Sequence, residues 1–202
     1  MNNKELIKIT ATYKIVTPLF IGDANQKARD ISPASIKGAL RFWWRALNWG
    51  RIKSEVQSET EALQCLHLEE STIFGSADGN IGQASFLLRV LFKNTKGVHN
   101  DWPTSTSQSG YLGIGLWESG NEENGNYKAA REYINEDQFF SIELICKPNF
   151  PIAAIEQLND VLKAWGFFGG LGSRCRRGFG SVAIEKLNET PLKFNKVVRL
   201  AW

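Results

Sequence analysis

The segment from Gly169 to Ser181 is the sequence feature that most limits which structures the chain can adopt. It holds five glycines and three arginines in thirteen residues, so it must form a turn between regular elements. Glycine lets a backbone approach a ligand closely, and arginine offers fixed charge in a geometry that suits phosphate. The spacing excludes a Walker A loop, since five residues separate Gly172 from Gly178 and no Gly-Lys-Ser/Thr follows. Cys175 replaces the third glycine of a dinucleotide-binding fingerprint. The segment therefore predicts a loop that binds the phosphates of a nucleic-acid backbone. The alternative is a turn between a helix and a strand whose arginines are exposed to solvent.

Alternating apolar and polar residues predict the strands. Residues 7–15 alternate strictly, and the same period of two recurs at 84–92 and 140–146 and begins again at Val182. Residues 111–117 are a candidate short strand. The chain therefore contains four main strands, with long polar stretches between the second and the third.

Apolar residues at helical spacing predict three helices. The first covers 34–49, after a Ser32-Pro33 start, and the second runs to about Leu68 from a capping-box pattern that begins at Ser54. The third begins near Ile155 and leads into the glycine-rich segment. Apart from the insertions, the order is β-α-β-β-α-β. This order predicts an α+β fold of the ferredoxin-like type (split β-α-β, RRM-like), with insertions between the second and third main strands.

Length and composition fit one ordinary globular domain. With 202 residues, 43% of them hydrophobic and 22% charged, the chain can bury one sizeable core. We assign this domain to residues 5–188 and a C-terminal tail to 189–202. The net charge of +3 is only mildly basic, so a nucleic-acid partner is argued from where the charge lies. The sequence has no apolar run of membrane-spanning length, and its three cysteines have no disulfide or metal spacing. We therefore expect a cytoplasmic protein without a metal, a cofactor or a membrane contact.

The first predicted helix carries a second concentration of positive charge. Its apolar face is predicted to contain four residues, Ile36, Leu40, Trp43 and Leu47. Its basic face contains three residues spaced by four, Lys37, Arg41 and Arg45, which no acid within the helix can pair. We expect this stripe and the loop arginines to border one groove, because both helices should lie against the same sheet. Trp44 and Phe179 are candidates for stacking on a base, with core packing as the alternative.

Few residues favour catalysis. The chain has two histidines: His67 lies near a predicted helix end, where histidine is usually structural, and His99 lies in a polar loop, where it is usually solvated. Asp23, Asp30 and Asp78 lie in loops, and without a metal such acids would repel phosphate. The sequence therefore predicts a binding protein with no catalytic residue.

Several of these features resemble the RAMP superfamily of CRISPR effector proteins. The glycine-rich segment lies between the second main helix and the last strand, where ferredoxin-like RAMP domains carry a glycine-rich loop. Residues 31–47, which include the tandem Phe42-Trp43-Trp44-Arg45, look like the first-helix signature of the first subunit of the type III-B (Cmr) complex. Ile73-Phe74-Gly75-Ser76 and residues 111–116 also fit that pattern. Members of this subunit family commonly have a second ferredoxin-like half, whereas this chain has one glycine-rich loop.

The resemblance implies a non-catalytic RNA-binding subunit of a CRISPR ribonucleoprotein in antiviral defence. Such a subunit would cap the guide (CRISPR) RNA near its 3′ region and help to engage target RNA. Its partners would be these two RNAs and the other subunits of the type III-B effector complex. Some RAMP proteins are ribonucleases, so an endoribonuclease that acts on CRISPR or target RNA is the alternative. The resemblance and the residues together assign RNA binding to thirteen positions: Lys37, Arg41, Trp44, Arg45, Gly170, Gly172, Ser173, Arg174, Arg176, Arg177, Gly178, Phe179 and Gly180.

Overall fold

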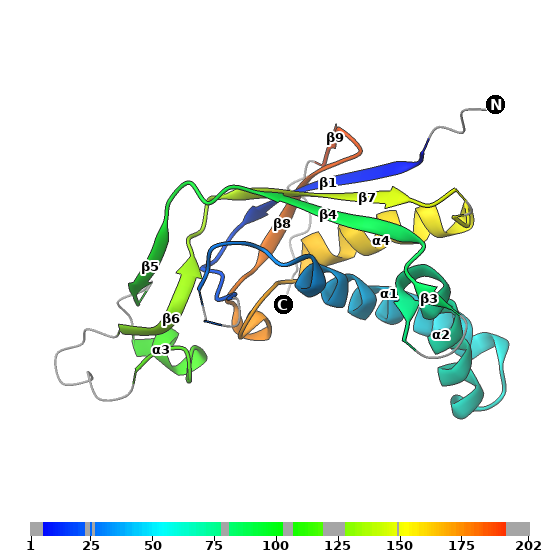
Figure 1. Ribbon diagram of the computed structural model, residues 1–202. Helices are drawn as coiled ribbons and strands as arrows, with labels where there is room; N and C mark the ends of the chain where they lie inside the picture. The colour runs from blue at the N-terminus through cyan, green and yellow to red at the C-terminus, as the bar shows by residue number, and fades with distance from the viewer. Residues whose placement is uncertain are drawn as a thin grey trace.

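A five-stranded antiparallel sheet lies at the centre of the computed structural model (Figure 1), which describes residues 6–22, 25, 27–77, 81–102, 107–118, 128–148 and 150–192. The strand order is β4-β7-β1-β8-β9. The strands are β1 (Lys8–Ile15), β4 (Phe86–Phe92), β7 (Phe139–Cys146), β8 (Val182–Leu187) and β9 (Thr190–Pro191). The first four are the predicted main strands, and all four predictions are confirmed. Strict alternation located β1 because every second side chain, such as Ile9 and Tyr13, is buried on one face of the sheet.

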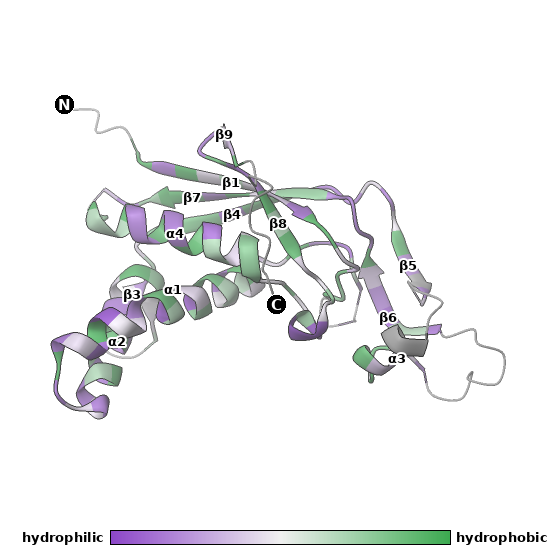
Figure 2. Ribbon diagram, turned by 180° about the vertical axis from the view of Figure 1, so that it is seen from behind, coloured by the Kyte–Doolittle hydropathy of each residue, from purple (hydrophilic) through white to green (hydrophobic). Residues whose placement is uncertain are grey.

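Two helices, α1 (Pro33–Glu55) and α4 (Ala153–Phe168), cover that face (Figure 1). Figure 2 shows hydrophilic and hydrophobic residues alternating along α4, as expected for a helix with one buried face. Tyr13 packs against Trp165 with 4.5 Å between ring centroids, and its hydroxyl donates to the Leu162 carbonyl at 3.0 Å. The Trp44 indole donates to Gln157 Oε1 at 3.0 Å, which joins α1 to α4. The predicted α+β class is confirmed.

The first helix is longer than predicted, and this changes where the next one begins. Because α1 continues to Glu55, Ser54 does not cap a helix, and its hydroxyl donates to the Arg51 carbonyl instead. The cap of α2 (Glu59–Phe74) is Ser58, whose Oγ accepts from the Glu61 N–H at 3.1 Å. The capping-box prediction at Ser54 was therefore wrong by one turn. None of the helices among the described residues is both long and apolar enough to cross a bilayer.

The segment between β4 and β7 forms an arm at one end of the molecule, while α2 lies at the other end (Figure 1). The arm contains β5 (Val98–Asp101), α3 (Ser107–Leu112) and β6 (Lys128–Ile134), and β5 pairs with β6. The predicted strand at 111–117 is wrong, because its first residues end α3 and only Trp117 forms an isolated bridge. A second short pair, β2 (Gly75–Ser76) and β3 (Gly82–Gln83), follows α2.

A small second hydrophobic cluster attaches the arm to the rest of the protein. Its buried members come from the loop after β1, the arm and the glycine-rich segment: Phe20, Trp102, Leu116, Ala129, Tyr133 and Phe179. Phe20 is its centre, with ring centroids 4.9 Å from Tyr133 and 5.5 Å from Phe179. The position of the glycine-rich segment is therefore fixed from two sides, by α4 and by the arm.

Candidate nucleic-acid interface

The segment from Gly169 to Ser181, here called the Gly/Arg loop, begins where α4 ends and leads into β8. The two ends of the loop are joined by an isolated antiparallel β-bridge between Gly170 and Ser181. Gly172 and Gly180 have φ values of +80° and +60°. A Cβ atom would lie 2.5 Å from the Phe20 carbonyl oxygen at Gly172 and 2.0 Å from the Leu171 carbonyl oxygen at Gly180. These two glycines are required by the backbone itself, because any side chain would collide with main-chain atoms.

Between the Gly/Arg loop and α1 lies a cavity of about 340 Å³, here called the aromatic groove. Its walls come from one side of α1, the end of α4 and the loop: Ser35, Ala39, Phe42, Trp43, Phe168, Gly169, Gly170, Leu171, Gly172, Cys175 and Arg176. Phe42 is 47% exposed and Phe168 is 78% exposed, although large aromatic side chains are usually buried. The Arg176 guanidinium lies 5.4 Å from the centre of the Phe42 ring. The groove therefore combines exposed ring faces with a cation.

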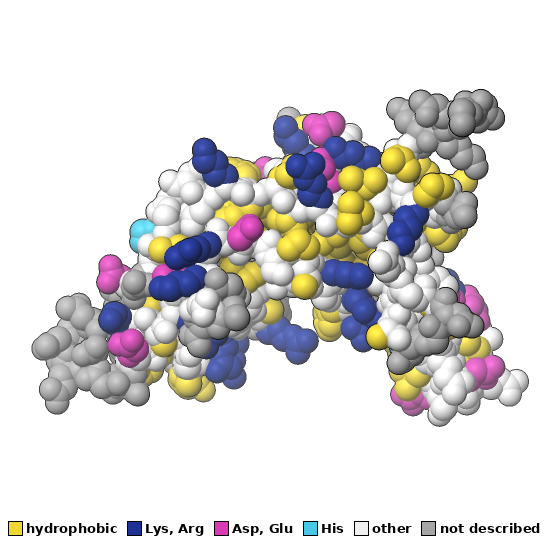
Figure 3. All heavy atoms as spheres, viewed as in Figure 1, with side chains coloured by type: hydrophobic (Ala, Val, Ile, Leu, Met, Phe, Trp, Pro, Cys, Tyr) yellow, Lys and Arg dark blue, Asp and Glu magenta, His cyan; other side chains and the backbone are white. Residues whose placement is uncertain are grey.

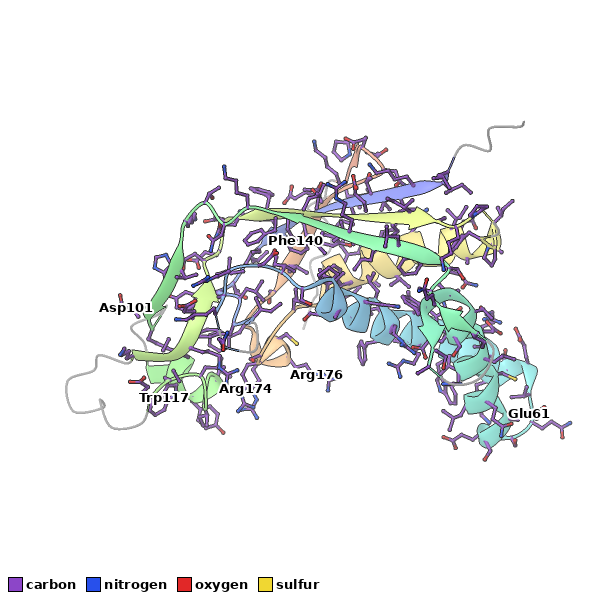
Figure 4. The ribbon with its side chains drawn as sticks, in the orientation of Figure 1. Glu61, Asp101, Trp117, Phe140, Arg174 and Arg176 are labelled. Atoms are coloured by element: carbon purple, nitrogen blue, oxygen red, sulfur yellow. The ribbon has the colours of Figure 1, made fainter. Side chains whose placement is uncertain are left out.

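The three loop arginines differ in their contacts with the rest of the protein. Arg176 and Arg177 are exposed in the short 3₁₀ turn Cys175–Arg177. Arg174 has a left-handed backbone, φ +58°, and its Nε and Nη2 donate to the Ile114 carbonyl at 3.0 and 2.6 Å. Figure 4 shows Arg174 and Arg176 projecting away from the sheet. Figure 3 shows Lys and Arg side chains along the hollow between the arm and the end of the molecule that holds α2. Arg174 thus holds the inserted arm to the loop, whereas Arg176 and Arg177 face solvent.

The basic stripe of α1 does not border this groove. Arg41 Nε lies 2.5 Å from Glu70 Oε1, and Arg45 Nε lies 3.6 Å from Glu70 Oε2. Glu70 comes from α2 and is only 2% exposed, so its carboxylate depends on these arginines for compensation. Arg41 is two residues from both Ala39 and Trp43, and at ~100° per residue it points to nearly the opposite side of α1. The predicted single groove of helix and loop arginines is wrong, because Arg41 and Arg45 support the contact of α1 with α2.

Lys37 is also outside the groove. It lines a different cavity between α1 and β4. Partial burial, followed by the charges of Arg41 and Lys147, lowers the pKa of Lys37. None of the described acidic residues forms an ion pair with it.

The two predicted stacking residues are both buried. Trp44 is 0% exposed in the main core and Phe179 is 6% exposed in the second cluster, so neither ring face is open to a base. Core packing, the alternative in each case, is what the structure shows. The open rings belong to Phe42 and Phe168, which the sequence did not single out. Phe168 carried a usable signal, because it precedes Gly169 and does not follow the apolar spacing of the helix before it.

Among the smaller loop residues, Gly170 and Gly172 line the groove, and Gly178 has φ +89° with open space around it. Ser173 is anchored by its N–H, which donates to the Phe20 carbonyl at 2.8 Å. Its Oγ accepts from Arg131 Nη1 of β6 at 3.4 Å. The structure therefore brings together the predicted loop residues and separates them from the predicted helix residues.

The residues considered for catalysis lie far apart along the fold. His67 is exposed on α2, and His99 on β5 is hydrogen-bonded to the Lys96 carbonyl at 3.1 Å. Asp30 Oδ1 accepts from the Ile31 N–H at 2.7 Å. Asp23 and Asp78 lie outside the described residues. Within the described ranges, no three His, Cys, Asp or Glu side chains are grouped so as to hold a metal ion.

The sequence of the chain matches a known protein family. The model of the RAMP superfamily matches residues 12–183. The CRISPR system Cmr subunit Cmr1-2 of Pyrococcus furiosus is 26% identical over 190 residues, which cover 86% of this chain and 93% of that protein. The range matched by the family model begins within β1, includes α1, α2, α4 and the Gly/Arg loop, and ends at the start of β8.

Solved structures share the fold at lower identity. The apo crystal structure of Cmr1 from Pyrococcus furiosus has a TM-score of 0.59 and 22% identity, and the match covers 90% of this chain and 50% of that one. A chain of a type IV-B CRISPR complex has a TM-score of 0.59 and 17% identity, with 93% of both chains covered. A chain of the type III-B Cmr-beta complex bound to cognate target RNA has a TM-score of 0.55 and 12% identity, with 90% and 60% covered. The chain thus spans about half the length of the solved Cmr1. Its sequence and its fold agree on one conclusion: the chain belongs to the RAMP superfamily.

Proposed function

We propose that this chain is a non-catalytic RNA-binding subunit of a type III-B CRISPR ribonucleoprotein. In that complex it caps the guide RNA near its 3′ region and helps to engage target RNA. The observation that carries the proposal is the aromatic groove, where Arg176 lies over the exposed ring of Phe42 beside the Gly/Arg loop. The similarity to Cmr1-2 and the likeness to a chain of an RNA-bound Cmr complex support the same function.

The groove suits single-stranded RNA. A base can stack on Phe42 or Phe168, because every base has a flat face, and such contacts do not depend on its identity. Arg176 and Arg177 are exposed on the same turn and can contact the phosphates that flank the base. We therefore expect binding that depends strongly on salt and weakly on sequence.

The arrangement of acids and bases supports binding without cleavage. A general base or acid must lie within hydrogen-bond reach of the reacting atoms. His67 lies on α2 and His99 on β5, at opposite ends of the molecule (Figure 1), and neither lines the aromatic groove. An endoribonuclease would need such a group beside the bound strand. We expect added RNA to remain intact in every binding assay below.

Fluorescence anisotropy with labelled single-stranded RNA across a salt series tests the proposal. The logarithm of the association constant should fall linearly with the logarithm of salt concentration, by ~0.7 for each phosphate contacted. The same titration with Phe168→Ala separates stacking from charge, because this change leaves the salt slope intact. Affinity that stays constant between low and physiological salt would contradict phosphate binding at the loop.

Purification without nuclease tests the assembly. The chain should retain RNA and the other subunits of its complex, detected by the ratio of absorbance at two wavelengths and by mass spectrometry of the copurified proteins. Recovery of the chain alone, from cells that express the whole complex, would contradict the proposed role as a subunit.

A further inference from the structure

A second cavity of about 340 Å³ lies beside α1, between its first turns and the start of β4. Its walls are mostly apolar and include Ala34, Phe86 and Leu88. Two lysines also line it, Lys37 from α1 and Lys147 from the residue after β7. We call it the two-lysine pocket. It is distinct from the aromatic groove, with which it shares no lining residue.

The pocket gathers positive charge without compensation from the described acids. Lys37 and Lys147 form no ion pair with any described acid. Partial burial, then the charge of Arg41 and then that of Lys147 lower the pKa of Lys37, and both lysines line the same pocket. Like charges held together in a partly apolar pocket favour an anion between them.

The pocket and the aromatic groove both open at the N-terminal half of α1. Ala34 and Lys37 line the pocket, while Ser35 and Ala39 line the groove. The N-terminus of the helix lies between them, and its first turn carries no acidic residue. The positive end of the helix dipole lies there, although Pro33 has no N–H and the Ala34 N–H donates to Ser32 Oγ. A phosphodiester strand that crosses this turn therefore meets no acidic side chain.

We propose that the two-lysine pocket holds a phosphate of the same RNA strand that occupies the aromatic groove. An α-helix is ~10 Å wide and a stacked strand advances ~3.4 Å along its axis per nucleotide, so the two contacts are at most roughly three nucleotides apart. This inference rests on the proposed function and adds to it the path of the strand. The RNA crosses α1 at its N-terminus, where Lys37 lies one helical turn before Arg41, whose charge also reaches that lysine.

Lys147→Glu in the full chain tests the proposal with two labelled RNAs. The shorter, of about two nucleotides, can fill only the groove, and the longer, of about twelve, can reach the pocket as well. The variant should bind the longer RNA roughly three- to tenfold more weakly, with a salt slope smaller by ~0.7, and should bind the shorter RNA as the unchanged protein does. Lys186→Glu is the matched control, because Lys186 is exposed on β8, two strands from β7, and should alter neither affinity by more than about twofold.

The outcomes separate the two proposals. If the unchanged chain binds neither RNA, the proposed function fails and this inference fails with it. If the unchanged chain binds both RNAs and Lys147→Glu binds them equally well, the proposed function stands and the strand path is wrong. If Lys147→Glu keeps its RNA affinity but no longer binds a purified subunit of the complex, the pocket is a protein contact and the inference is overturned. Lys147→Gln, which removes the charge without reversing it, should give a smaller loss in the same direction if the charge-reversed variant melts early.

Discussion

The arginines of α1 and those of the Gly/Arg loop have the same chemistry but different surroundings. Arg41 is 2.5 Å from the carboxylate of Glu70, which is buried by the packing of α2 on α1. Arg176 lies over the exposed ring of Phe42 and has no described carboxylate as an ion-pair partner. A buried acid that would otherwise be unpaired holds the first arginine in place, while the second keeps its charge available. The difference shows that the charge of an arginine in a basic cluster stays unpaired only where no acid from a distant part of the chain packs against it.

The largest effect should come from the backbone of the loop. Gly180→Ala places a Cβ 2.0 Å from a carbonyl oxygen at positive φ, so we expect a loss of roughly 3 kcal/mol or more in the free energy of unfolding. Gly178→Ala is the matched control: it also has positive φ but has open space around it, and it should cost only ~1 kcal/mol. Urea unfolding of the two variants measures the difference. Equal losses would show that the loop is less tightly fixed than the structure indicates.

The second-largest effect should come from removing Arg41, which pairs with the buried carboxylate of Glu70. Arg41→Ala leaves the Glu70 carboxylate with only the more distant Arg45, so the free energy of unfolding should fall by ~2–3 kcal/mol. This loss in the free energy of unfolding is smaller than the loss expected on breaking a fully buried ion pair, because the Arg41 side chain remains about a third exposed. The RNA affinity of the folded variant should stay within about twofold of the unchanged protein.

The control for Arg41→Ala removes the acid as well. Arg41→Ala combined with Glu70→Leu should regain most of the lost stability, because no charge is then left buried without a partner. A stable Arg41→Ala variant that loses RNA binding would reverse the comparison between the two sets of arginines.

The smallest effect concerns the open ring at the end of α4. Phe168→Ala should weaken RNA binding by ~1–2 kcal/mol through lost stacking, while stability changes by less than about 0.5 kcal/mol, because the side chain is 78% exposed. Ile152→Ala is the control, since Ile152 is 77% exposed and lies just before the other end of the helix. Anisotropy and thermal melting of both variants separate the two contributions. Similar RNA affinities for the two variants would mean that Phe168 does not stack on a base.

Local patterns predicted the sheet well because strand periodicity is a local property. The alternation at 7–15 fixed the buried face of β1, and the glycines at 172 and 180 marked a loop whose backbone admits nothing larger. By contrast, β6 at 128–134 carries Arg131 and Glu132 next to buried Tyr133 and was missed, because its burial does not alternate.

Contacts between distant parts of the chain determine which residues are buried or paired, and local sequence patterns did not predict these contacts. Trp43 and Trp44 are neighbours in α1, and the packing of α1 on α4 determined that Trp44 is the core residue. Glu70 lies 29 residues from Arg41, and no local pattern indicates that the two will pair. The loop residues therefore lie together as predicted, whereas Arg41 and Arg45 do not join them, because only the loop is built from neighbouring residues. The assignment of RNA binding to the loop stays a prediction.

One measurement tests most directly whether the Gly/Arg loop carries RNA binding: the salt-dependent affinity for single-stranded RNA of the double variant Arg176→Ala and Arg177→Ala. We predict binding at least about tenfold weaker at low salt, a salt slope reduced by ~1.4 for two lost phosphate contacts, and an unchanged melting temperature. The control is Lys93→Ala with Lys186→Ala, which removes one exposed charge just after β4 and one on β8 and should leave the affinity within about twofold. If the loop variant binds as tightly as the unchanged protein, or if the control loses as much, the loop is not the RNA site.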